Sequence, residues 1–362
     1  MSRKTRLLAA FGAHSGVGGG GVSLSAETSF FRKSVLPYAE DVLSNRGLRV
    51  FFETLLPLDF VIGSSFRPLG SGQFLIGGPF GIRLSSDEMH ERIRNSKKIQ
   101  DQDCGKNRLG RYRDENVCGS PSNVGGYAYW GIEDRLVRMA KRLGKPLEFE
   151  NERTSVEVLF AELRVFDAYA NLANYLKAKT GSASYVVSPL FGNDITLNYG
   201  FNSLDFWPAF DRLGSFDQEC LSLIAKAFQA HAEYQFLRDG IFSKQVRGAA
   251  DKNPDEDFVV VRGYAHSHMT KSFDPNIFDV KVALSSSKGH LSFFDDAHAE
   301  VFEQEDPTKV DFDRYARLFA SQVERGAKLN LTLCEYLSLG VLRGFRFPGV
   351  SFIENATYGL TI

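Results

Sequence analysis

The amino-acid sequence predicts an α/β fold with a mostly parallel central sheet flanked by helices. A short apolar run at residues 6–11 is followed by a helical pattern and by a second strand-like run at residues 48–56. Strand, helix and strand within roughly 50 residues form a βαβ unit, whose two strands are parallel. A third run, FVVVR at residues 258–262, is the clearest strand in the chain. Ligands of such open sheets bind at the carboxyl edge, where these strands end.

The first part of the chain contains further elements between and after these strands. Ser25 is suited to cap a helix of about 20 residues that ends near Gly47. Residues 57–84 are apolar and interrupted by glycine, and their pattern favours neither helix nor strand. A helix is expected from Ser86 to about Lys97. The polar residues 98–126 are expected to form an insertion or a lid.

Long helices dominate the middle of the chain. Residues 131–144 have the pattern of an amphipathic helix, and residues 145–150 that of a short strand. Residues 152–179 form a long helical pattern. Its apolar stripe consists of Leu159, Leu163, Phe166, Ala170 and Ala173. Residues 181–213 are mixed and rich in turn residues.

The last third of the chain continues this alternation. Ser215 and Gln218 form a capping-box pair that opens a helix extending towards Arg238 and Asp239. A strand is expected at residues 277–284 and a helix at residues 311–325. We expect residues 1–290 to form one α/β domain and residues 291–362 a C-terminal extension packed on it.

Composition and charge exclude several classes of protein. The 362 residues include 43 basic and 44 acidic side chains, so no global field attracts nucleic acid. No run approaches the roughly 18 apolar residues of a membrane span. The apolar stretch of the N-terminal MSRKTRLLAAF is too short for a signal peptide, which favours a cytoplasmic protein. A small molecule or a peptide is the expected partner, and the oligomeric state stays open.

The cysteine pattern favours free thiols. Cys104, Cys118, Cys220 and Cys334 show no C-x-x-C spacing, which is typical of a protein in a reducing compartment. Cys104 and Cys118 share one polar loop and are placed to pair if the protein is exported.

A glycine tract, LLAAFGAHSGVGGGG at residues 7–21, raises the question of phosphate binding. It lacks the G-x-x-x-x-G-K-[ST] pattern, and no lysine follows before Lys33. A dinucleotide site needs a helix that starts within the glycine motif, whereas the expected helix starts only after Ser25. The tract is better interpreted as a loop that presents His14 at the end of a strand.

His14 and Glu53 are the first candidates for catalysis. Each follows a strand of the expected βαβ unit, so both belong to the carboxyl edge of the sheet. A carboxylate beside an imidazole orients the ring and prepares it as a general base. The alternatives are a polar turn residue for His14 and a solvent-facing strand end for Glu53.

A second histidine motif follows the FVVVR strand. His266 and His268 lie at positions i and i+2, and on an extended segment their side chains share a face and can ligate one metal ion. The alternative is that one faces the site and the other the surface. Arg238 and Asp239 form either a solvated C-terminal helix turn or a guanidinium clamp for an oxyanion.

The order of these motifs resembles the superfamily of the erythromycin esterases, the TIKI/TraB-type proteins and the ChaN-type haem-uptake proteins. The first motif, Gly-Ala-His, is one residue shorter than the Gly-x-x-His of the superfamily. The matching segments are Phe11–His14, Arg49–Glu53, Gly131–Leu136 with Leu147–Glu150, Arg238–Asp239 and Gly263–His266.

The resemblance implies a hydrolase that cleaves an ester, lactone or amide bond. His14 is then the general base that activates water, Glu53 orients it, and Arg238 stabilises the oxyanion. His266 is a second base, or a metal ligand together with His14 and Glu53 if a divalent ion is used. The substrate-binding residues implied are Ser15, Glu150, Asp239 and Tyr264.

The resemblance also implies two alternatives. A member of the haem-uptake branch binds haem, with His14 or Tyr264 as an iron ligand. A catalytically degenerate member has lost the activity, and the shortened first motif is consistent with that loss.

Overall fold

The computed structural model describes the residues that build the core of the fold. These are residues 4–12, 37–38, 40–41, 47–52, 58–62, 64, 66–77, 80–107, 147–149, 155–181, 206–284, 310–328 and 351–352.

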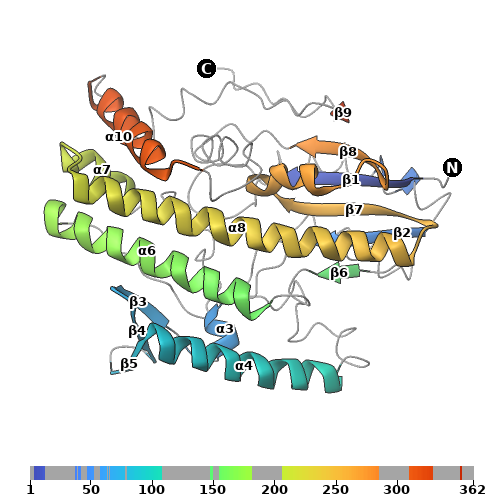
Figure 1. The fold of residues 1–362 in the computed structure, drawn as a ribbon, viewed down its shortest axis with the longest axis horizontal. Helices are drawn as coiled ribbons and strands as arrows, with labels where there is room; N and C mark the ends of the chain where they lie inside the picture. Colours follow the sequence, from blue (N-terminus) through green and yellow to red (C-terminus); the bar gives the residue numbers. More distant parts are fainter. Residues whose placement is uncertain are drawn as a thin grey trace.

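A parallel sheet forms one half of the described structure (Figure 1). Its strand order is β6-β2-β7-β1-β8-β9, and every neighbouring pair is parallel. The strands span Leu147–Phe149 (β6), Gly47–Phe52 (β2), Glu256–Gly263 (β7), Thr5–Gly12 (β1), Phe278–Leu284 (β8) and Ser351–Phe352 (β9). The α/β class and the parallel orientation of β1 and β2 are therefore confirmed. The two strands do not pair with each other, because β7 lies between them.

Strand register aligns the carboxyl ends at one edge of the sheet. Gly12 of β1 is level with Gly263 of β7, and Phe52 of β2 is level with Phe149 of β6. The centre of the sheet is apolar, with Leu7, Val50 and Val260 fully buried. A strand buried on both faces reads as a continuous apolar run, which explains the clear signal of FVVVR.

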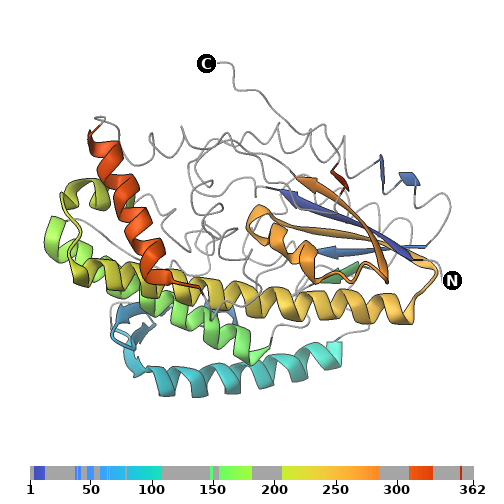
Figure 2. The ribbon, with the colours of Figure 1, turned by 45° about the horizontal axis from the view of Figure 1, so that its top comes forward.

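Long helices form the second half of the structure. α6 (Val156–Thr180) and α8 (Gln218–Lys252) lie side by side, and α10 (Phe312–Lys328) lies across the N-terminal part of α8 (Figure 2). Lys179 pairs with Asp217 at 3.3 Å, and Tyr169 contacts His231 at 3.3 Å. Since the numbers rise along one helix as they fall along the other, α6 and α8 are antiparallel.

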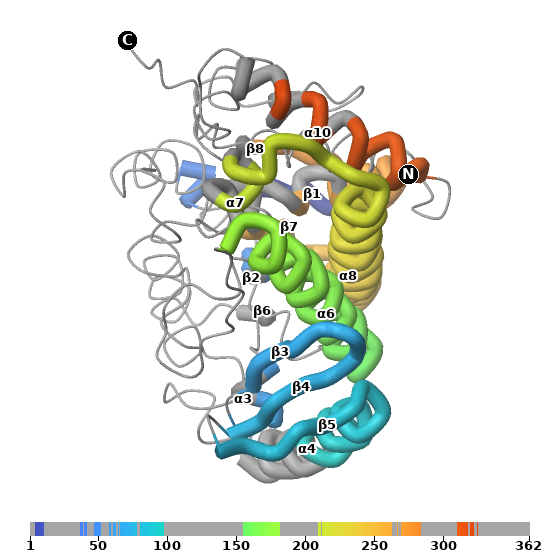
Figure 3. Tube along the Cα trace, turned by 90° about the vertical axis from the view of Figure 1, so that its left-hand side faces the viewer, coloured from blue at the N-terminus to red at the C-terminus, as the bar shows by residue number. Residues whose placement is uncertain are grey.

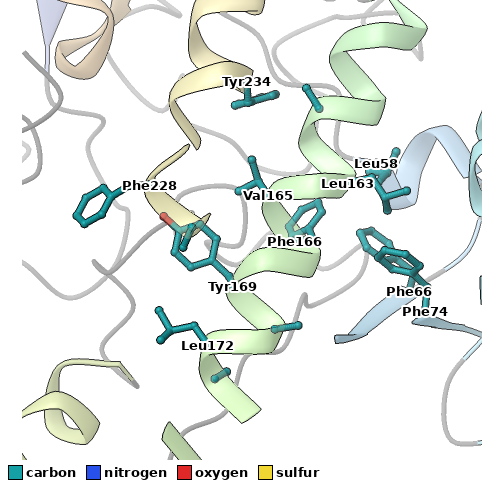
Figure 4. Close-up of a cluster of buried hydrophobic side chains, with 14 of the residues drawn as sticks. Leu58, Phe66, Phe74, Leu163, Val165, Phe166, Tyr169, Leu172, Phe228 and Tyr234 are labelled. Atoms are coloured by element: carbon teal, nitrogen blue, oxygen red, sulfur yellow. The ribbon is translucent and has the colours of Figure 1, made fainter. Parts of the chain in front are cut away.

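The helices bury one large apolar cluster between them. Figure 4 shows Val165 and Tyr169 on the side of α6 that faces α8, whereas the ring of Phe166 contacts that of Phe66 with centroids 5.2 Å apart. All residues of the apolar stripe expected on α6 are buried. α7 (Phe206–Leu213) and α10 close the far end, where the rings of Phe210 and Phe319 meet edge to face at 4.9 Å.

A small antiparallel sheet packs on the other side of α6 (Figure 3). It consists of β3 (Phe66–Gly70), β4 (Gln73–Ile76) and β5 (Ile82–Ser85), and it is flanked by α3 (Leu58–Ile62) and α4 (Ser86–Asn107). These elements account for the glycine-broken stretch that gave no assignment from sequence. Short strands with buried alternate residues, such as Phe66 and Pro68, give a weak signal when glycines interrupt them.

Polar side chains of α6 hold the first turn of this small sheet. Gly70 has φ +86°, which a side chain rarely adopts. Asn171 Oδ1 accepts a hydrogen bond from Ser71 N at 2.8 Å, and Asp167 Oδ1 accepts one from Gly72 N at 2.9 Å. The turn is thus bound to the helix through its backbone amides.

Several element boundaries differ from expectation. α4 continues to Asn107, ten residues into the segment expected to be an insertion. The N-cap of α8 is Asp217, whose carboxylate accepts from Cys220 N at 2.9 Å, so the capping box of Ser215 and Gln218 is wrong. α8 also continues well past Asp239, to Lys252.

Other expectations lie wholly or mostly outside the described residues. They concern the Ser25 helix before residue 37, the helix at residues 131–144, and residues 108–126. The boundary at residue 290 stays a prediction, although α10 packs on α8 and β9 pairs with β8.

Cys220 is a buried free thiol, and burial raises its pKa to about 12. Within the described part of the chain, no helix combines the length and apolar character needed to cross a membrane.

Candidate functional site

A buried polar layer on α8 separates two apolar cores. Residues of the N-terminal half of α8, such as Phe228, belong to the core shared with α6. Phe242 and Val246 of its C-terminal half belong to a different core, shared with the sheet residues Phe51 and Phe258. Between these halves lie buried polar side chains, namely His231, Gln235, Arg238, Asp239 and Ser243. Burying polar groups opposes folding unless they are paired, so such a layer indicates a functional site.

The polar layer lies where α8 passes the carboxyl edge of the sheet. β7 begins only four residues after α8 ends, so the helix runs antiparallel to the strand. The Phe242 ring contacts Phe51, close to the carboxyl end of β2, with centroids 6.2 Å apart. Residues before Phe242 therefore extend beyond the edge of the sheet, into the region where open α/β sheets bind ligands.

An aspartate and a histidine pair in this layer. Asp239 comes from the middle of α8, and His266 comes from η4 (Tyr264–Ser272), the 3₁₀-helix that follows β7. His266 Nδ1 lies 2.8 Å from Asp239 Oδ1, and only 4% of His266 and 3% of Asp239 is exposed. A carboxylate bound to Nδ1 fixes the ring orientation and leaves Nε2 for proton transfer.

Arg262 holds the same carboxylate from the side of the sheet. Its Nη1 lies 2.8 Å from Asp239 Oδ1 and donates to Met269 Sδ at 3.3 Å. The guanidinium carbon also lies 4.5 Å above the centroid of the Phe242 ring. The Arg262 side chain is fully buried, which is compatible with a charge only because these partners surround it.

Arg238 approaches the histidine from the other side. Its Nη1 lies 3.5 Å from His266 Nε2, and its guanidinium carbon lies 5.8 Å from the centroid of Tyr234. A guanidinium only donates hydrogen bonds, and Nδ1 donates to Asp239. The geometry therefore selects the neutral imidazole with its proton on Nδ1 and a lone pair on Nε2.

A second buried histidine belongs to the same electrostatic environment. His231 Nδ1 lies 3.3 Å from the Tyr169 hydroxyl, within hydrogen-bond distance. The pKa of His231 is lowered to about 3, mainly because burial penalises the charged imidazolium and also because the groups His266 and Arg238 lie nearby. Burial also raises the pKa of Tyr169 above its usual range. Both side chains are therefore neutral at ordinary pH.

Glu162 of α6 brings a further carboxylate to this level of the structure, and only 1% of it is exposed. Tyr169 contacts His231 across the antiparallel helices. Glu162 lies about two turns before Tyr169 on α6, and Arg238 lies about two turns after His231 on α8. Because the two helices are antiparallel, Glu162 and Arg238 are level along their axes. Buried ionisable residues of α6, α8 and η4 thus lie at one level of the structure.

The structure brings together three of the residues predicted to form the site: Arg238, Asp239 and His266. The alternative in which Arg238 and Asp239 form a solvated helix end is wrong, because both residues are buried in the middle of α8. The extended geometry considered for His266 and His268 is also wrong, because both lie in a 3₁₀-helix, where positions i and i+2 point in different directions.

The remaining predicted residues lie outside the described residues. These are His14, Ser15, Glu53 and Glu150, together with the side chains of Tyr264 and His268. Their roles stay predictions. The strands that precede them, β1, β2, β6 and β7, all end at the edge where Asp239 and His266 meet.

Sequence reasoning missed Arg262, His231 and Glu162. Arg262 carried a usable signal, because a charged residue ends an otherwise apolar strand. Glu162 carried a similar one, since it lies next to Leu163 of the apolar stripe in a buried helix.

The observed position of Arg238 disfavours a divalent ion on His266, while the metal site expected from His14, Glu53 and His266 stays a prediction because His14 and Glu53 lie outside the described residues. Nδ1 is bound to Asp239, and Nε2 faces the positive guanidinium of Arg238 at 3.5 Å. A metal ion on Nε2 would be repelled by that charge. Within the described ranges, no group of three His, Cys, Asp or Glu side chains is arranged to hold a metal ion. The haem alternative depends on the side chains of His14 and Tyr264, which lie outside those ranges.

Comparisons of the chain with protein-family models, with curated proteins and with solved structures give no match.

Proposed function

We propose that this chain is a hydrolase of an ester, lactone or amide bond, with histidine-activated water as the nucleophile. The observation that carries the proposal is the buried hydrogen bond of 2.8 Å between His266 Nδ1 and Asp239 Oδ1. The pair lies at the carboxyl edge of a parallel sheet, where ligands of this fold class bind. The resemblance to the erythromycin esterase superfamily supports the same reaction class.

The reaction follows from the order of the polar groups. His266 Nε2 takes a proton from water, and the hydroxide adds to the carbonyl carbon of the substrate. Asp239 stabilises the imidazolium that forms, because its carboxylate already accepts from Nδ1. The tetrahedral intermediate then collapses, and the imidazolium returns the proton to the leaving oxygen or nitrogen. Water is consumed, and an acid and an alcohol or amine are released.

Arg238 is the proposed stabiliser of the oxyanion. In the structure its Nη1 faces Nε2 at 3.5 Å, the position that the attacking water occupies during the reaction. We propose that the guanidinium turns from Nε2 to the carbonyl oxygen when substrate enters. Donors aimed at the developing negative charge are commonly the largest contribution of an active site. His14 and Glu53 are proposed to complete the site from the ends of β1 and β2.

The test is hydrolysis of p-nitrophenyl acetate, a γ-thiolactone and a p-nitroanilide by the purified chain and its variants. His266→Gln and Asp239→Asn should each lower kcat at least about 100-fold, the usual contribution of a general base. The control is His90→Gln, since His90 lies on a different helix, α4, where its ring contacts that of Phe160 in a tilted arrangement with centroids 4.2 Å apart. That variant should retain wild-type turnover.

Two results would contradict the proposal. Wild-type turnover by His266→Gln would show that the pair of Asp239 and His266 is not catalytic. Failure of the wild-type chain to hydrolyse any of these probes would reject the reaction class. His14→Ala, assayed in parallel, tests the general base expected from the sequence, and full turnover by that variant would remove His14 from the mechanism.

A further inference from the structure

Polar atoms of two buried, uncharged side chains in the layer on α8 have no hydrogen-bond partner among the described residues. They are Gln235 Oε1 and Ser243 Oγ. Only 5% of Gln235 and 8% of Ser243 is exposed to solvent. Both residues are one helical turn from Asp239, Gln235 before it and Ser243 after it.

The charged side chains beside these atoms, Asp239 and Arg262, form an ion pair at 2.8 Å. Asp239 accepts from His266, and Arg262 binds Asp239 and Met269. A buried polar atom without a partner lowers stability, and folded proteins contain few of them. An apolar side chain at either position would avoid this loss. Two such atoms on either side of a proposed catalytic pair therefore point to a ligand that supplies the missing partners.

We infer that Gln235 and Ser243 bind the substrate on either side of the bond that is cleaved, an inference that rests on the proposed function. Gln235 Oε1 is an acceptor, so its partner is an N–H or O–H group of the substrate. Residues four apart on a helix are about 6 Å apart, and the eight-residue span from Gln235 to Ser243 covers about 12 Å along the axis. The substrate class is thus an extended acyl compound with an amide N–H close to the reacting carbonyl.

Two matched esters test the role of the substrate N–H. The p-nitrophenyl esters of N-acetylglycine and of levulinic acid differ by one replacement, an N–H in the first and a CH₂ in the second. After correction for spontaneous hydrolysis, the wild-type chain should favour the N-acetylglycine ester in kcat/KM by about tenfold, the worth of one hydrogen bond to a buried group. Gln235→Leu should remove this preference. Gln229→Leu is the control, because Gln229 is exposed on the same helix and donates to Glu233 at 2.9 Å.

Melting temperature separates a binding role from a structural one. If Gln235 Oε1 and Ser243 Oγ gain hydrogen-bond partners only when substrate binds, Gln235→Leu and Ser243→Ala should raise the melting temperature of the free protein, by about 1–3 °C each. If either side chain supports the fold, its replacement should lower the melting temperature. A lower melting temperature together with an unchanged preference would overturn the inference.

A binding measurement keeps this inference separate from the proposed function. N-acetylglycine and levulinate, the acids released from the two esters, are added to the wild-type chain and to Gln235→Leu while the melting temperature is recorded. A larger upward shift with N-acetylglycine that is lost in Gln235→Leu supports the inference even if neither ester is hydrolysed. Equal shifts with both acids, or a shift with neither, overturn it even if both esters are hydrolysed.

Discussion

Replacement of Arg262 by methionine tests whether the buried carboxylate of Asp239 depends on this arginine. The Arg262 side chain is fully buried and the Asp239 side chain is 4% exposed, at a separation of 2.8 Å. Removal of one partner of a buried ion pair typically lowers the free energy of unfolding by 3–5 kcal/mol, because it leaves a charge without compensation. His266 keeps its hydrogen bond to the same oxygen. We therefore expect a loss near the lower limit, about 3 kcal/mol, or roughly a 150-fold change in the unfolding equilibrium.

A double-mutant cycle measured by urea unfolding isolates the contribution of the pair. It compares the wild-type chain with Arg262→Met, with Asp239→Leu and with both changes together. The double variant should be more stable than the sum of the single losses predicts, by at least about 1 kcal/mol, because it contains no unpaired charge from this pair. A loss below about 1 kcal/mol for Arg262→Met, or additive losses in the double variant, would refute the reasoning.

Two other predictions concern the folded state. His231 has its pKa lowered from 6.5 to about 3, so the unfolded chain binds a proton first, and stability should fall as the pH drops from 6.5 towards 3. Between pH 7.5 and pH 5, the free energy of unfolding of the wild-type chain should therefore fall by about 2 kcal/mol more than that of His231→Asn. An equal fall in both proteins would contradict the assigned burial of His231. Gly70→Ala should destabilise the chain by about 2–3 kcal/mol in urea unfolding, because it forces an alanine into positive φ and places a Cβ against Asn171. The distance from that Cβ to Asn171 Oδ1 would be 2.7 Å, whereas a Cβ on Gly181, which is also at positive φ, meets no atom within 4 Å. Gly181→Ala should therefore lower the free energy of unfolding by less than Gly70→Ala, and equal losses would contradict the steric argument.

The sheet could be predicted from the sequence because its strands are buried on both faces. The run at residues 258–262 is almost entirely apolar, and the structure places β7 in the middle of the sheet. α6 was predictable for a similar reason, since its stripe of Leu159, Phe166 and their neighbours follows the helical period. The order of the strands could not be predicted from the sequence, because β7 lies between β1 and β2 although it follows β2 by about 200 residues in the chain.

The middle of α8 could not be predicted because buried polar residues interrupt its apolar periodicity. Gln235, Asp239 and Ser243 occupy buried positions that an ordinary helix fills with apolar residues. The pattern therefore indicated a helix end near Arg238, whereas the helix continues to Lys252. Site residues were recognised by chemical type, as with Arg238, Asp239 and His266. Their contacts depend on how α8 crosses the end of β7, which no local pattern contains.

The central place of β7 has a consequence for synthesis on the ribosome. Both β1 and β2 pair along one edge with β7, which emerges about 200 residues after β2. At typical translation speeds of 5–20 residues per second, the edges of β1 and β2 that face β7 lack this partner for at least about 10–40 seconds. A chaperone that shields the emerging N-terminal segments during this interval should raise the yield of native protein. A chain truncated before residue 256 should form inclusion bodies in a cell.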